Sequence, residues 1–161
     1  MIKLLIIEDD VQLNTALKIY FEKTQYLVFQ AFNCKEARQM IKREPDIIIV
    51  DVGLPDGSGI DLCRHMLADK KIPVIFLTAR DEEKDILEGY EAGCEEYVTK
   101  PVSPKVLLNI LRLHLSLKMM LEDYKKLCDI AVYCGFYDQS HFIKEMKRYI
   151  GISPLQLLDH Q

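Results

Sequence analysis

The stretch DIIIVDVGLPDGSG, Asp46 to Gly59, contains the pattern that decides the fold. Four consecutive β-branched residues, 47–50, are followed at once by Asp51 and then by a loop that contains Pro55 and three glycines. A continuous apolar run of this length is typical of a strand that is buried on both faces, as in a parallel sheet covered by helices. The sequence therefore predicts a central strand at residues 46–50, followed by a carboxylate held on an exposed turn.

Four further runs, at residues 2–7, 26–31, 73–77 and 95–99, have the same apolar or β-branched character, and amphipathic stretches of helical period lie between them. Helix starts are indicated by Asn33 and by Ser103-Pro104. This alternation predicts an α/β fold with a five-stranded, parallel, doubly wound sheet. From about residue 103 the strand pattern stops, so we expect a small all-α extension with breaks at Gly135 and at residues 151–154.

Composition limits the class of protein. The chain has 161 residues, 49% of them hydrophobic, which suits one ordinary domain with a small appendage. No apolar run reaches the roughly 18 residues of a membrane span and no cleavage signal follows the N-terminus, so we expect a cytoplasmic protein without a membrane partner. The five cysteines are scattered and form no CxxC pair, which argues against a disulfide framework or a zinc ribbon.

Charge is distributed unevenly along the chain. Residues 1–103 contain 13 Lys and Arg against 19 Asp and Glu, whereas residues 104–161 contain 8 against 6. A slightly basic tail permits contact with nucleic acid but does not require it.

Polar residues follow four of the predicted strands. Glu8 and Asp9 come after the first strand, Asp51 after the third, Thr78 after the fourth and Lys100 after the fifth. The carboxyl ends of parallel strands meet at one edge, and several carboxylates with one lysine are costly there unless a cation binds; an all-oxygen ligand set favours Mg²⁺. Asp51 is then a candidate nucleophile toward a phosphoryl group, whose oxygens Mg²⁺, Lys100 and Thr78 would neutralise.

The acids after the first strand, Asp51-x-x-Leu-Pro, LTAR at 77–80 and EAGCEEYVTKP at 91–101 together resemble the CheY-like receiver domain of two-component response regulators. The resemblance covers about residues 1–118 and implies a flavodoxin-like fold, with Asp51 phosphorylated by a sensor histidine kinase or a small phosphodonor. It also implies a Mg²⁺ site in which Asp9, Asp51 and the backbone carbonyl of Gly53 are direct ligands and Glu8 acts through water. We expect Asp10, one place further on, to start a helix rather than bind the metal.

The same resemblance implies roles for residues after the fourth and fifth strands. Lys100 pairs with the phosphoryl group and its peptide bond to Pro101 is expected to be cis. Thr78 and Tyr97 form a switch pair that changes the surface of the fourth helix, fifth strand and fifth helix. The chain would then be no enzyme, but a phosphoacceptor that catalyses only its own phosphorylation and dephosphorylation. The alternative is a phosphohydrolase with an aspartyl nucleophile, but that class places a DxD pair after the first strand, where this chain has adjacent acids.

Residues 119–161 resemble the second half of an AraC-type DNA-binding domain, joined to the receiver through a long helix. The residues that carry this resemblance are Asp129-Ile130-Ala131, Gly135-Phe136, Asp138-x-Ser140-His141-Phe142, Lys144, Lys147, Gly151 and Ser153-Pro154. The implied DNA-binding residues are Gln139, Ser140, His141, Lys144, Lys147 and Arg148. The family normally has two helix-turn-helix units, and this stretch resembles only one.

A unit of about 40 residues rarely buries enough apolar surface to stand alone, so we expect its core to be shared with the linker helix or with a partner chain. Three basic residues predict weak, salt-sensitive binding. Two outputs stay open for this tail. Phosphorylation either pairs two chains as a homodimer and brings two half-domains onto adjacent major-groove turns to regulate transcription, or the tail acts through protein contact instead of DNA.

Overall fold

The computed structural model describes residues 1–79, 96–122 and 126–159. The chain divides into two compact units, Met1–Val106 and Leu107–Gln161, and the division falls inside helix α5 (Pro104–Glu122). The domain boundary expected at residue 118 stays a prediction. Among the helices in the described ranges, none is long and apolar enough to cross a membrane.

The first unit is built on a parallel sheet. Its described strands are β1 (Ile2–Ile7), β2 (Tyr26–Ala31), β3 (Ile47–Asp51), β6 (Val74–Thr78) and β7 (Glu96–Thr99). They lie in the order β2-β1-β3-β6-β7, and each neighbouring pair is parallel. This flavodoxin-like order confirms the predicted five-stranded sheet and places its topological switch point between β1 and β3.

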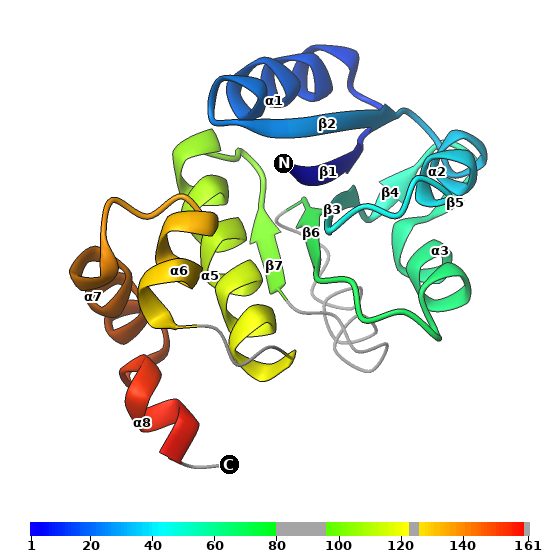
Figure 1. The fold of residues 1–161 in the computed structure, drawn as a ribbon. Helices are drawn as coiled ribbons and strands as arrows, with labels where there is room; N and C mark the ends of the chain where they lie inside the picture. The colour runs from blue at the N-terminus through cyan, green and yellow to red at the C-terminus, as the bar shows by residue number, and fades with distance from the viewer. Residues whose placement is uncertain (80–95, 123–125, 160–161) are drawn as a thin grey trace. The chain divides into compact units, whose positions relative to one another are not determined.

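Three described helices connect these strands: α1 (Val11–Lys23), α2 (Cys34–Ile41) and α3 (Gly59–Met66). The predicted start at Asn33 is confirmed, since its side chain accepts a hydrogen bond from the Glu36 amide. A short hairpin, β4 (Gly53–Leu54) with β5 (Gly57–Ser58), joins β3 to α3. Figure 1 shows α2 and α3 together on one side of the sheet and α1 along β2 on the other.

The central strands β1, β3 and β6 are buried on both faces. Leu5, Val50 and Phe76 belong to the core cluster that also contains residues of α2 and α3. The residues that alternate with them, such as Leu4 and Ile49, are fully buried and point to the opposite face. Burial of both faces explains why these strands are continuously apolar rather than alternating.

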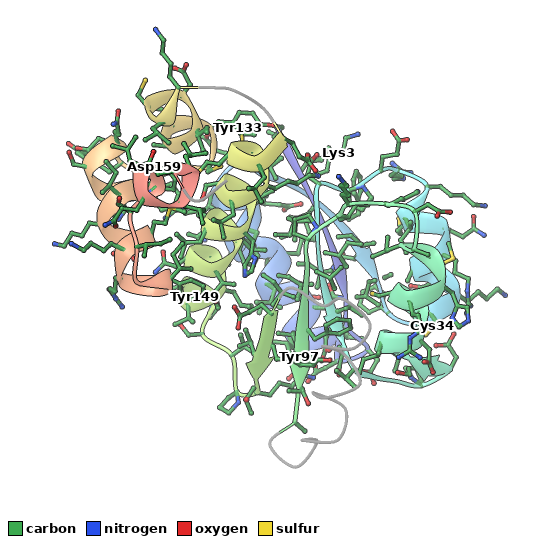
Figure 2. The ribbon with its side chains drawn as sticks, turned by 90° about the horizontal axis from the view of Figure 1, so that it is seen from below. Lys3, Cys34, Tyr97, Tyr133, Tyr149 and Asp159 are labelled. Atoms are coloured by element: carbon green, nitrogen blue, oxygen red, sulfur yellow. The ribbon has the colours of Figure 1, made fainter. Side chains whose placement is uncertain are left out.

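The second unit is helical, with α6 (Leu127–Tyr133), α7 (Gln139–Ile150) and α8 (Pro154–Asp159) after α5. Its buried side chains include Ile130, Ala131, Phe136, Phe142 and Met146. Two contacts join α5 to this core. Cys134 Sγ lies 3.7 Å from Met119 Sδ, and the ring of Tyr149, labelled in Figure 2, lies 6.4 Å from the ring of His114. The tail therefore shares its core with the linker helix, one of the two arrangements expected from its length.

Candidate functional site

The candidate site lies at the carboxyl edge of the sheet. Glu8 directly follows β1, Asp51 is the last residue of β3, Thr78 is the last residue of β6, and Lys100 directly follows β7. Glu8, Asp51 and Thr78 are buried, although all three are polar. Four strands of the sheet thus each bring a polar residue to the edge where ligands bind in this class of fold.

Lys100 joins the two buried carboxylates. Its Nζ donates to Asp51 Oδ2 at 2.6 Å and to Glu8 Oε1 at 2.7 Å. Burial lowers the pKa of Lys100, but the hydrogen bonds to Asp51 and Glu8 outweigh it and hold that pKa above its ordinary value. Burial first, and the neighbouring Asp51 carboxylate second, raise the pKa of Glu8 above its ordinary range. Among the described residues, the Lys100 ammonium is therefore the group that stabilises negative charge at this edge against desolvation.

The loop after β3 orients the Asp51 carboxylate. The Gly53 amide donates to Asp51 Oδ1 at 2.9 Å, so each of the two oxygens has a defined donor. The chain then returns closely against β3, where the Gly59 amide donates to the Val52 carbonyl. A Cβ at Gly59 would lie 2.1 Å from the Asp51 carbonyl oxygen, which only glycine avoids. The glycines of the opening stretch thus permit the turn that holds Asp51.

Three carboxylates are placed to share a cation. Oxygens of Glu8, Asp9 and Asp51 all lie within 4.8 Å of one another, and Asp9 is exposed. Glu8 Oε2 is buried and has no hydrogen-bond partner, although Oε1 accepts from Lys100. An unsatisfied buried acceptor and two further carboxylates, with one ammonium among the described residues, fit a hard divalent cation such as Mg²⁺. The Gly53 carbonyl stays a predicted ligand.

Asp10 has the structural role expected for it. It is the N-cap of α1, and its Oδ1 accepts from the amides of Gln12 and Leu13 at 3.0 and 3.2 Å. This carboxylate is therefore used at the helix start.

The predicted switch residues lie on β6 and β7. Thr78 Oγ1 donates to the Ala79 carbonyl at 3.1 Å. Tyr97, labelled in Figure 2, is half-buried, and its ring is stacked at 5.2 Å on Phe76 of the neighbouring strand. The Lys100–Pro101 peptide bond is cis, as expected. Arg80, residues 91–95 of the EAGCEEYVTKP motif and the predicted fourth helix lie outside the described residues.

Two residues near the site were not predicted from the sequence. Asn14 is fully buried and its side chain donates to the Glu8 carbonyl at 2.9 Å. Asp56 accepts from the first two amides of α2, those of Cys34 and Lys35, at 2.7 and 3.1 Å. A signal for Asn14 was present, because it shares the buried stripe of α1 with Leu17 and Phe21 at helical spacing, and a polar residue on such a stripe needs a partner.

A second candidate surface is the outward face of α7. Five of the six predicted DNA-contact residues are exposed there: Gln139, Ser140, Lys144, Lys147 and Arg148. Phe142 and Met146 on the inward face are fully buried. Asp138 caps the helix by accepting from the His141 amide at 2.7 Å, and Arg148 pairs with Glu145 at 3.7 Å.

His141, the sixth predicted DNA contact, is placed differently from the others. Its Nδ1 accepts from the Tyr137 amide at 3.1 Å, and its ring meets the Phe136 ring edge-on at 5.6 Å. The side chain is half-buried. His141 therefore holds the turn before α7, and its Nδ1 is already engaged.

Residues 4–112 match the model of the response regulator receiver domain, and residues 100–160 match that of a helix-turn-helix domain. The transcriptional regulatory protein ResD of Bacillus subtilis is 35% identical over 104 residues, which are 64% of this chain and 43% of ResD. The regulatory protein VanR of Enterococcus faecium is 34% identical over 125 residues, which are 77% of this chain and 52% of VanR. The chain thus spans about half the length of these curated relatives.

Solved structures agree with the family match. A two-component response regulator from Clostridium difficile superposes with a TM-score of 0.69 at 28% identity and covers 74% of this chain and 98% of its own. The non-phosphorylated receiver domain of HemR from Leptospira biflexa gives a TM-score of 0.65 at 34% identity and covers 72% of this chain and 95% of its own. The receiver model matches residues 4–112, which are more than half of the chain. This chain therefore belongs to the response regulator receiver family and carries a helix-turn-helix domain at its C-terminal end.

Proposed function

We propose that this chain is a two-component response regulator that accepts a phosphoryl group on Asp51 and thereby controls DNA binding by its helix-turn-helix, as a regulator of transcription. The observation that carries the proposal is the Asp51 carboxylate, held between the Gly53 amide and the Lys100 ammonium beside Glu8 and Asp9. A sensor histidine kinase or a small phosphodonor would supply the phosphoryl group.

The residues of the site divide the work of phosphoryl transfer. An Asp51 oxygen forms the new bond to phosphorus while the bond to the donor breaks and its electron pair leaves with the donor group. The Lys100 ammonium, already bonded to Asp51, would neutralise charge on the phosphoryl oxygens, and the Thr78 hydroxyl would donate a hydrogen bond to them. Mg²⁺ held by Glu8, Asp9, Asp51 and the Gly53 carbonyl would supply further positive charge to those oxygens. The same groups would serve hydrolysis, in which a water oxygen bonds to phosphorus while the bond from Asp51 to phosphorus breaks and inorganic phosphate leaves. The chain would thus catalyse only its own phosphorylation and dephosphorylation.

Labelling by a small donor tests this assignment. Purified protein should take up one phosphoryl group from radiolabelled acetyl phosphate when Mg²⁺ is present, and the Asp51→Asn variant should take up none. Asp61→Asn, an exposed acid on α3, is a matched control and should label like the wild type. Equal labelling of Asp51→Asn would overturn the proposal.

DNA is the partner that the second unit supports best. The helix-turn-helix match and the relatives named as transcriptional regulatory proteins favour transcription control over an output that acts only through protein contact. The exposed face of α7 carries Lys144, Lys147 and Arg148 with few acids. Because one such helix makes few phosphate contacts, we infer that phosphorylation pairs two chains as a homodimer on adjacent major-groove turns. Such a DNA target is consistent with the expected cytoplasmic location.

A salt titration separates the two outputs. Affinity for genomic duplex should rise when beryllofluoride is added as a phosphoryl mimic, and should fall steeply as salt concentration increases. Weak binding that ignores both the mimic and the salt would instead assign the tail to protein contact.

A further inference from the structure

We propose that Asn14 is a positioning residue for the acidic turn Glu8–Asp10 and that it sets the affinity of this turn for a divalent cation. The inference rests on the proposed function, since it concerns the same cation site. The side-chain hydrogen bonds of Asn14 go to two backbone carbonyls and to Gln30 rather than to the carboxylates themselves. Its action is on the backbone that carries them.

The side chain of Asn14 ties together two strand ends. Its Nδ2 donates to the Glu8 carbonyl at 2.9 Å and to the Ala31 carbonyl at 3.2 Å. The Glu8 amide also donates to the Ala31 carbonyl, at 3.0 Å. One buried side-chain amide therefore holds the Glu8 carbonyl and the end of β2, and the end of β2 in turn accepts from the Glu8 amide.

The acceptor side of Asn14 is also satisfied. Gln30 Nε2 donates to Asn14 Oδ1 at 2.9 Å, which fixes the orientation of the Asn14 amide. The Asn14 backbone amide donates to the Asp10 carbonyl at 2.9 Å, so the same residue binds the turn at both ends. Asn14 is fully buried and has each of its polar groups paired. Such a network holds one geometry, because any rotation of the amide leaves a buried group unsatisfied.

These hydrogen bonds of Asn14 matter for cation binding because the turn Glu8–Asp10 is short. Asn14 holds the backbone carbonyl of Glu8, and Asp10 is fixed as the cap of α1. Asp9 lies between these two fixed points. Residues that hydrogen-bond to metal ligands and fix their orientation typically contribute 10- to 100-fold to metal affinity. A loose turn would let Asp9 and Glu8 move apart, as their mutual repulsion favours.

The experiment measures Mn²⁺ binding to the full chain by the loss of the free-ion paramagnetic resonance signal. Asn14→Leu keeps a similar volume but removes all three side-chain hydrogen bonds, and we expect its Kd for Mn²⁺ to rise at least tenfold. Gln30→Leu removes only the bond that orients the Asn14 amide, and a rise of at least threefold is expected. Leu17→Ala is the control, because Leu17 is a fully buried residue of the same helix stripe without a hydrogen bond to the turn.

Leu17→Ala should lower Tm but change the Kd less than twofold, which separates positioning from general stability. The inference is overturned if either variant, Asn14→Leu or Gln30→Leu, folds and binds Mn²⁺ with a Kd within twofold of the wild type. If Asn14→Leu does not fold, the result for Gln30→Leu decides alone. Equal loss of affinity in Leu17→Ala also overturns it. A wild type that binds no Mn²⁺ and takes up no label refutes the proposed function itself, whereas labelled wild type with unaffected variants refutes only the role of Asn14.

Discussion

Lys100 is the only described basic residue within hydrogen-bond distance of Asp51 and Glu8, and it contacts both. The two carboxylates belong to different strands, so one ammonium group ties β1 and β3 to the residue after β7. The second Glu8 oxygen is left without a donor. At the scale of single residues the site is therefore arranged to gain from one more positive charge, which a cation supplies.

The thiols provide a prediction at the same scale. Burial raises the pKa of Cys134 to about 12, and burial with a hydrogen bond to Asp56 raises that of Cys34 to about 11. Cys128 is exposed. Because the thiolate is the reactive form, iodoacetamide at pH 8 should alkylate Cys128 well before Cys34 or Cys134, as measured by mass spectrometry of timed digests. The assay is best made in a Cys94→Ser background, since Cys94 lies outside the described residues.

The difference in alkylation rate between Cys128 and the buried thiols requires the folded state. Addition of urea above the unfolding midpoint should bring all of these thiols to similar rates. Rapid alkylation of Cys134 in native protein would show that the helical unit opens far more readily than its buried core implies.

At the scale of elements, the hairpin after Asp51 is fastened to α2 by Asp56. Hydrogen bonds from the amides of Cys34 and Lys35 lower the pKa of Asp56, an exposed carboxylate, and outweigh the desolvation that acts the other way. A carboxylate at a helix start is also favoured by the helix dipole. The loop that orients Asp51 thus depends on a cap that lies 22 residues away in sequence.

This cap predicts a defined pH dependence. A lowered folded pKa means that Asp56 contributes stability above its ordinary pKa near about 4, and that this contribution is lost as pH falls through the folded value. Asp56→Asn should therefore be less stable than the wild type in urea unfolding at pH 7, and the difference should shrink below about pH 4. Asp61→Asn, which loses only an exposed pair with Arg64, should show little change at either pH. A constant difference across pH would contradict the charged cap.

Two glycines in the helical unit allow a matched comparison. Gly135 and Gly151 have left-handed φ angles of 88° and 85°. A Cβ at Gly151 meets nothing within 4 Å, whereas one at Gly135 lies 3.3 Å from Arg112 Nε. Gly151→Ala should cost about 1–2 kcal/mol of unfolding free energy from backbone strain alone. Gly135→Ala should cost more, because it must also displace a buried part of the α5 side chain.

Circular dichroism in a urea titration measures both variants against the wild type. Equal costs would show that the Arg112 side chain moves aside freely, and a smaller cost at Gly135 would contradict the close approach of α5 to this turn.

At the scale of the whole molecule, the proposal couples an acidic receiver to a weakly basic helix. Lys144→Ala and Lys147→Ala should each reduce the slope of log affinity against log salt by about 0.9. Lys18→Ala, an exposed lysine of α1 that pairs with Glu22, should leave the slope unchanged and is the control. Fluorescence anisotropy with labelled duplex, measured with beryllofluoride present, gives these slopes. Unchanged slopes in the α7 variants would place any DNA contact elsewhere.

His141→Ala tests the same helix in another way, because its side chain holds the turn rather than projecting outward. It should weaken binding through loss of the helix start while the salt slope stays near that of the wild type. A reduced slope would mean that the imidazole contacts phosphate directly.

Much of the fold follows from local pattern. Strand positions at residues 2–7 and 26–31 match the apolar runs, and those of β3 and β6 begin one residue later than predicted. These strands, and helix starts such as Asn33, can be predicted because the signal for each lies in neighbouring residues of the sequence. A strand buried on both faces needs a continuous apolar run, and a helix cap directly precedes its helix. The acidic residues of the site were identifiable for the same reason, because each lies at the end of an apolar run or within two residues of it.

The sequence by itself thus determined which strands form and which polar residues follow them. Only the tertiary structure decided which of those residues pair: Lys100 with Glu8 across 92 positions, Asn14 with the Glu8 carbonyl and the end of β2, and Asp56 with α2. The physical reason is that a polar side chain can satisfy its hydrogen bonds with many partners. The choice among them is made when the packing of the sheet and helices excludes water and leaves only the nearest donors and acceptors.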